Sequence, residues 1–141
     1  MDPDKDADGG YDAVRVYLWL GMLADDAPGR AALIEHFKPV LAATVRQGHV
    51  PEYFDSATGT VRGSGPVVFS AALLPLLTTA NDAEADMALI SQRETIRQSA
   101  PLADGYYNQS LLMFGQGWDE QRYRFDKDGR LLPNWMSSCI K

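Results

Sequence analysis

The run 66–79 restricts the fold of this chain more than any other segment, because it is apolar nearly all the way round a helix. A helix with one apolar face lies at a surface, whereas a helix that is apolar on every side is buried. The apolar side chains of the run are Val67, Val68, Phe69, Ala71, Ala72, Leu73, Leu74, Leu76 and Leu77. We therefore expect an inner helix that other elements cover on every side.

Helical spacing and end signals predict further helices on both sides of this run. Their ranges are 12–23, 28–48, 82–98 and 104–118. Asn81 or Asp82 is a suitable N-cap for the helix 82–98, and Asp104 for the helix 104–118. The sequence therefore predicts an all-α chain of five main helices, and short turns between them favour antiparallel helical hairpins.

Two prolines fall inside these ranges, and two short segments have β propensity instead. Pro39 and Pro75 lack a backbone donor, so we expect a break or kink near Lys38 and an end or bend at Pro75. The segment near 50–63 reads as a small hairpin or ordered loop around a glycine-containing turn. The segment near 122–132 reads as two short strands around the Asp128-Gly129 turn.

Composition restricts the function classes. A length of 141 residues predicts one domain, and 45% hydrophobic residues are enough for a core. The net charge of −6 argues against a nucleic-acid partner, and no apolar run is long enough to insert into a membrane. Residues 1–10 read as a disordered acidic leader without the apolar stretch of a signal peptide. His36, His49 and the lone Cys139 are isolated in the sequence, so we expect no metal site.

The segment 11–19 concentrates residues of possible catalytic use. On a helix Asp12 and Arg15 are neighbours, and Tyr11 and Trp19 share their stripe. A carboxylate held by a cation between flat rings suits a site that grips a sugar and activates a water. From the residues alone, an ordinary helical ion pair with rings in the core is the more common arrangement.

Several segments, in order along the chain, resemble glycoside hydrolase family 8, the inverting endo-glucanases, and within it the cellulases encoded with bacterial cellulose synthases. The resemblance covers residues 11 to 139, nearly the whole chain. The segments that carry it are Tyr11-Asp12-Ala13-Val14-Arg15-Val16-Tyr17-Leu18-Trp19, Thr44-Val45-Arg46-Gln47-Gly48, Gly65-Pro66, Phe69-Ser70-Ala71-Ala72-Leu73-Leu74-Pro75, Tyr106-Tyr107, Phe114-Gly115-Gln116-Gly117-Trp118-Asp119 and Leu131-Leu132-Pro133-Asn134-Trp135.

The resemblance implies a fold, a reaction and roles for particular residues. The fold is an (α/α)6 barrel, of which five helices form less than half. The reaction is endo-acting cleavage of β-1,4-glucan (cellulose) with inversion and without metal or organic cofactor. It needs two carboxyl groups about 6.5 to 9.5 Å apart, one as acid and one as base. Asp12 matches the base and Arg15 the arginine beside it, with Tyr11 near the attacking water.

Three further rings, Trp19, Tyr106 and Tyr107, are candidates for the wall of the substrate cleft, since rings stack on the apolar faces of glucose units. Each of them, like Trp118, has an alternative role as a core residue that fills a helix interface.

The resemblance also implies that parts of the family's domain lie outside this sequence. The general-acid Glu and an Asp-Ala-Asp signature lie upstream in the family, so the chain resembles the C-terminal part only. Full-length members are exported, which implies a periplasmic or secreted protein. We therefore expect a truncated chain that carries the general-base half and is inactive by itself.

Two hypotheses from different classes remain. Either the chain belongs to a β-1,4-glucanase, or it is a non-catalytic helical remnant that binds glucan weakly or associates with another chain. A lone fragment would also lack part of the cover of its inner helix. We therefore expect Phe69 and Leu73 to line an exposed apolar patch, and the chain to be marginally stable and to self-associate.

Overall fold

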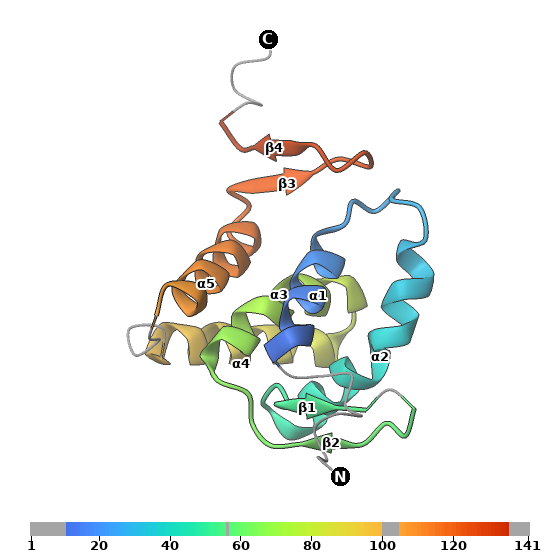
Figure 1. Ribbon diagram of the computed structural model, residues 1–141, viewed down its shortest axis with the longest axis vertical. Helices are drawn as coiled ribbons and strands as arrows, with labels where there is room; N and C mark the ends of the chain where they lie inside the picture. The colour runs from blue at the N-terminus through green and yellow to red at the C-terminus, as the bar shows by residue number, and fades with distance from the viewer. Residues whose placement is uncertain (1–10, 56, 100–104, 136–141) are drawn as a thin grey trace.

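The computed structural model describes residues 11–55, 57–99 and 105–135, with the backbone alone for Tyr11 and Asp12. Five helices make up most of this part of the chain (Figure 1). They are α1 (Tyr11–Met22), α2 (Arg30–Gln47), α3 (Val67–Ala80), α4 (Ala83–Ser99) and α5 (Tyr106–Asp119). The predicted all-α class and the number of main helices are therefore confirmed for the described residues. None of these helices combines the length and apolar character that crossing a membrane requires.

Both predicted hairpins are present as short antiparallel pairs. The first joins β1 (Tyr53–Phe54) to β2 (Val61–Arg62), and the second joins β3 (Tyr123–Phe125) to β4 (Leu131–Pro133). Figure 1 shows β3 and β4 beyond the C-terminal end of α5, with β1 and β2 on the far side of the helices. The hairpins therefore cover opposite ends of the helical part.

Helix α3 is the centre of the fold, as its composition predicts. It packs against α1, α4 and α5, and every residue from 68 to 77 is buried. The expected exposed patch at Phe69 and Leu73 is wrong, because both side chains have 0% exposure. Three helices of the same chain already cover the side chains for which we expected missing neighbours.

Glycines let α1 and α5 approach α3 closely. A Cβ added to Gly21 of α1 would lie 2.3 Å from the Leu76 nitrogen and 2.6 Å from the Pro75 Cβ. A Cβ added to Gly115 of α5 would lie 2.2 Å from the Ala71 carbonyl oxygen. The Cα–H of Gly115 therefore faces this carbonyl, a contact of the kind seen between closely packed helices.

The prolines do not interrupt their helices, which corrects the expected break near Lys38 and the expected end at Pro75. Pro39 is exposed on α2, where water can reach the carbonyl that its missing N–H would have bonded. Pro75 is buried on α3, on the side that packs against Gly21 of α1. The packing of α3 against α1, α4 and α5 offsets the loss of one helical hydrogen bond.

A buried polar chain joins α2, α3 and α4. The Ser70 hydroxyl donates to the Gln92 side-chain oxygen at 2.8 Å, and the Gln92 amide donates to the Gly48 carbonyl at 3.1 Å. Both side chains are buried, so each satisfies a polar atom that would otherwise destabilise the core. Helix α4 begins as predicted, with the Asp82 carboxylate accepting from the Ala85 N–H at 2.8 Å. The predicted cap Asp104 lies outside the described residues.

Candidate active site

Helix α1 presents to solvent the face on which the sequence places the catalytic stripe. Arg15, Val16 and Trp19 are all exposed and recur at helical spacing. The backbone of Tyr11 and Asp12 forms the first turn of α1, and spacing puts Asp12 on this face. Their side chains lie outside the described residues. The pairing of Asp12 with Arg15 therefore stays a prediction, as does the position of Tyr11 beside a water.

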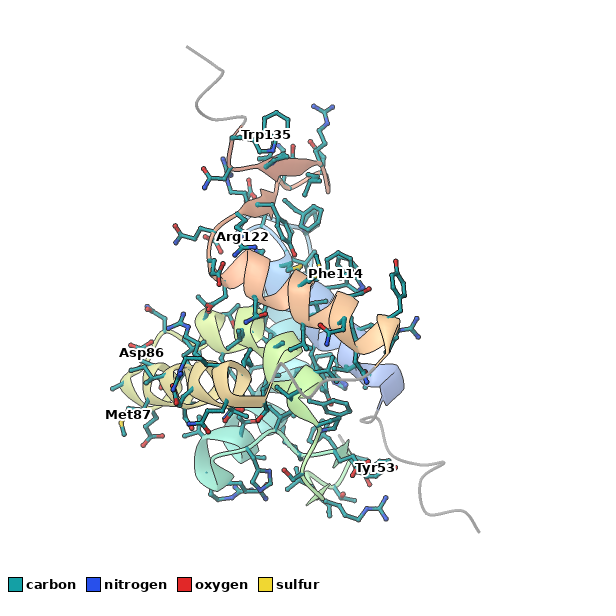
Figure 2. All side chains as sticks on the ribbon, turned by 90° about the vertical axis from the view of Figure 1, so that its left-hand side faces the viewer. Tyr53, Asp86, Met87, Phe114, Arg122 and Trp135 are labelled. Carbon is teal, nitrogen blue, oxygen red and sulfur yellow. The ribbon has the colours of Figure 1, made fainter. Side chains whose placement is uncertain are left out.

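The first turn of α5 carries two exposed rings. Tyr106 is 90% exposed and Tyr107 is 44% exposed. Within the described residues Tyr106 therefore fills no helix interface, and the alternative core role does not apply to it. Figure 2 shows the starts of α1 and α5 on the same side of the molecule. We name this region, formed by the first turns of α1 and α5, the first-turn end.

Trp19 lies at a different place from the two tyrosines. Its ring centroid is 6.4 Å from that of Phe114 and 6.4 Å from that of Phe125, and half of its surface is exposed. Trp19 follows Asp12 by two helical turns, about 10 Å along the axis. The structure therefore groups Trp19 with the second half of α5 and with β3. Its role as a cleft wall is a prediction that these contacts do not test.

The opposite end of α5 has a network that sequence reasoning missed. We name this region, formed by β3, β4 and the last turn of α5, the hairpin end. Arg93 of α4 donates to both carboxylate oxygens of Asp119, through Nε at 2.9 Å and Nη2 at 2.7 Å. These bonds raise the pKa of Arg93. The partners are 26 positions apart in the sequence, so no local pattern indicates the pair.

Tyr123 anchors the hairpin end to the helices. Its hydroxyl donates to the Phe114 carbonyl at 2.6 Å, and its ring lies against Gly117. Burial raises the pKa of Tyr123 to about 12. The hydroxyl therefore stays protonated and keeps its bond well above neutral pH.

Among the described residues, no group of three or more His, Cys, Asp or Glu side chains could hold a metal ion. His36 is exposed, as expected, and its ring meets Phe37 edge-on at 5.0 Å. Its neighbours Glu35 and Lys38 form an exposed ion pair of 2.6 Å.

Comparisons with known proteins show the family of this chain. A family profile described as "Glycosyl hydrolases family 8" matches residues 2–121. An endoglucanase of Escherichia coli (strain K12) is 45% identical over 139 residues, which are 99% of this chain and 36% of that protein. An endoglucanase of Xanthomonas axonopodis pv. citri (strain 306) is 42% identical over 134 residues, 95% of this chain and 35% of that protein.

A solved structure gives the same result for the fold. The endo-1,4-D-glucanase of Vibrio fischeri ES114 superposes with a TM-score of 0.79 at 36% identity, covering 96% of this chain and 39% of that one. The chain thus spans little more than a third of the length of these relatives. Its helices correspond to part of a helical barrel, and the chain belongs to glycosyl hydrolases family 8.

Proposed function

We propose that this chain supplies the general-base part of an endo-acting, inverting β-1,4-glucan hydrolase. Asp12 is the base, Arg15 keeps its carboxylate ionised and oriented, and Tyr11 borders the attacking water. Tyr106, Tyr107 and Trp19 contact the glucan. The observation that carries the proposal is the exposed stripe of α1, which combines with two exposed rings at the start of α5.

The position of Asp12 suits a base. Asp12 belongs to the first turn of α1, and the N-terminal end of a helix favours the ionised form of a carboxylate. Arg15, one turn further along, adds a full positive charge beside it. An ionised carboxylate is what the reaction needs when it takes a proton from water on one face of the sugar.

The other half of the chemistry comes from outside these 141 residues. Inversion needs a carboxylic acid about 6.5 to 9.5 Å from the base, so that a water fits between base and sugar. We propose that the acid belongs to the part of the family's domain that this chain does not span. The complete protein then acts on cellulose outside the cytoplasm, whereas the 141 residues alone release no more than traces of product.

A chimera tests the assignment directly. Residues 11–135 replace the aligned segment of the Escherichia coli endoglucanase, and release of reducing ends from carboxymethyl cellulose is measured. The chimera should hydrolyse the polymer, with inversion visible by proton NMR of the first anomer formed. Asp12→Asn should lower kcat by ~10²–10⁴-fold, the usual effect of losing a general acid or base.

The controls separate the proposal from its rival. Asp25→Asn removes an exposed carboxylate beyond the end of α1, outside the stripe, and should leave kcat unchanged. A folded chimera that binds cello-oligosaccharides but does not cleave them would support the non-catalytic alternative. Robust hydrolysis by the bare 141 residues would show that the acid had been placed wrongly.

A further inference from the structure

A pocket of about 500 Å³ lies at the hairpin end, and none of the residues assigned above to catalysis or glucan contact lines it. The C-terminal end of α3, the middle of α4, the last turn of α5 and both strands of the second hairpin contribute to it. Its volume is within the range of sites that hold small molecules. Since α5 has 14 residues, this pocket is about 20 Å from Tyr106 along the helix axis.

The backbone at the pocket has an unusual residue at a helix end. Helix α5 ends in a Schellman motif, in which the Arg122 N–H donates to the Gly117 carbonyl and the Gln121 N–H to the Trp118 carbonyl. The residue at the left-handed position of this motif is usually glycine. Here it is Gln121, with φ of 59°. Gln121 thus carries a side chain at a position whose backbone conformation favours glycine.

Gln121 lines the pocket, and among the described residues its side chain makes no hydrogen bond. Its amide therefore offers both a donor and an acceptor to a ligand. Conformations of this kind persist where the surrounding structure fixes them, and they cluster at active sites and ligand-binding sites.

The other polar groups of the pocket are nearly neutral in sum. The bidentate bonds between Arg93 and Asp119 neutralise that pair, and Asp119 is only 12% exposed. Arg124 adds one cation at the rim. Each partner of the pair keeps donor or acceptor capacity beyond the two bonds, because a guanidinium has five donors and a carboxylate about four acceptor positions.

Rings complete the wall. Trp118 is half-buried and lines the pocket, and Tyr123 presents its ring there while its hydroxyl is bonded to Phe114. Flat rings beside planar amide, carboxylate and guanidinium groups match a sugar, which has apolar C–H faces and neighbouring hydroxyls. A strongly anionic ligand matches the pocket less well than a sugar, because Arg124 is the one cation among the described lining residues that Asp119 does not neutralise.

From this combination we propose that the pocket is a second, non-catalytic binding site for a glucose unit of β-1,4-glucan. The choice of glucan rests on the proposed function, while the pocket itself does not. Glucan bound in this pocket would raise the local concentration of polysaccharide at the first-turn end, as linked binding sites do.

In the test, the 141-residue chain is titrated with cellotetraose, and binding is measured by calorimetry and by the NMR shift of the Trp118 indole. Gln121→Gly should weaken binding at least fivefold, because it removes the amide. The melting temperature should stay the same or rise, since glycine suits the left-handed position. Arg93→Met should weaken binding similarly. Arg97→Met, on the same helix but outside the pocket, is the matched control.

Each outcome decides something. If Gln121→Gly binds as the unmodified chain does, or if inorganic phosphate displaces cellotetraose, the sugar site is refuted. If binding depends on Tyr106 instead, the pocket proposal fails and the glucan class stands. If the pocket binds cellotetraose while the chimera cleaves no β-glucan, the site stands and the proposed function fails.

Discussion

The two ends of α5 differ in how their side chains are used. At the hairpin end, Tyr123 bonds to the helix backbone and Asp119 is held by both nitrogens of the Arg93 fork. At the first-turn end, Tyr106 and Tyr107 are exposed. The anchoring side chains of the hairpin end are therefore bonded within the chain, beside a pocket that stays open, whereas the first-turn end presents exposed rings.

The contrast indicates that the bonded side chains of the hairpin end stabilise the fold, whereas the exposed rings of the first-turn end are available for contact with substrate. The side chain of Tyr106 is 90% exposed and contributes little to the stability of the fold. Changing a buried contact with the backbone, in contrast, lowers the free energy of unfolding. Changes in the inner helices, and at the bonded side chains Asp119 and Tyr123 of the hairpin end, should therefore lower the free energy of unfolding. Changes at the first-turn end should alter activity in the chimera and leave folding unaffected.

The largest effect on stability is expected from Gly115→Ala. Its new Cβ would lie 2.2 Å from the Ala71 carbonyl oxygen, a backbone atom that cannot rotate away. We expect a loss of about 2–3 kcal/mol by overpacking, even though alanine stabilises helices by about 1 kcal/mol relative to glycine. Urea denaturation measures this loss. Met113→Ala, on the same helix and 71% exposed, should change stability by less than about 0.5 kcal/mol.

A smaller loss is expected from Tyr123→Phe at the hairpin end. The substitution removes the 2.6 Å bond to the Phe114 carbonyl but keeps the ring against Gly117. The free energy of unfolding should fall by about 0.5–1.5 kcal/mol, the net value of one hydrogen bond. An unchanged unfolding curve would mean that β3 is held by its ring contacts alone.

The same tyrosine predicts a pH dependence. Burial raises the pKa of Tyr123 from 10.0 to about 12 in the folded chain, so folding favours the protonated form. Its contribution is complete below pH 10 and is lost as the pH rises from 10 to 12. Thermal melts across this interval should show a decline that Tyr123→Phe reduces. An equal decline in both proteins would assign the effect to other groups.

The smallest effect on folding is expected from Tyr106→Ala. Because the side chain is 90% exposed, stability should change by less than about 0.5 kcal/mol. In the chimera the same substitution should lower kcat/KM by about 2–10-fold, the loss expected for one ring contact with a sugar. A large loss of stability with unchanged kcat/KM would reverse the comparison between the two ends.

Local patterns predicted the elements of this fold well. The apolar run around α3, the Asp82 cap and both hairpin turns depend on neighbours in sequence, and the structure has each of them. The predicted break near Lys38 and the predicted end at Pro75 are wrong because they weigh one lost hydrogen bond alone. Water can replace that bond at the exposed Pro39, and packing offsets its loss at the buried Pro75. The alternatives, a kink and a bend, stay predictions. The cover of Phe69 likewise depends on α1, α4 and α5 together, which no local pattern reports.

The candidate site could be predicted only in part. Exposure of Arg15, Trp19 and Tyr106 follows from helical spacing once the inner face of each helix is known. The grouping of Trp19 with Phe114 and Phe125, and the fork between Arg93 and Asp119, join residues from separate elements. Such pairs are fixed by how helices pack, so the sequence offered no signal for them.

The glycine contacts on α3 have a consequence for how the protein opens. Gly21 and Gly115 bring α1 and α5 against backbone atoms of α3, beside Pro75 and Ala71, and no flexible side chain there can absorb a partial separation. The three helices should therefore unfold as one cooperative unit. In native-state hydrogen exchange, the amides of Leu18, Leu73 and Leu112 would then share one opening free energy. The amides of α2, which has an exposed proline at its centre, would exchange through smaller local openings.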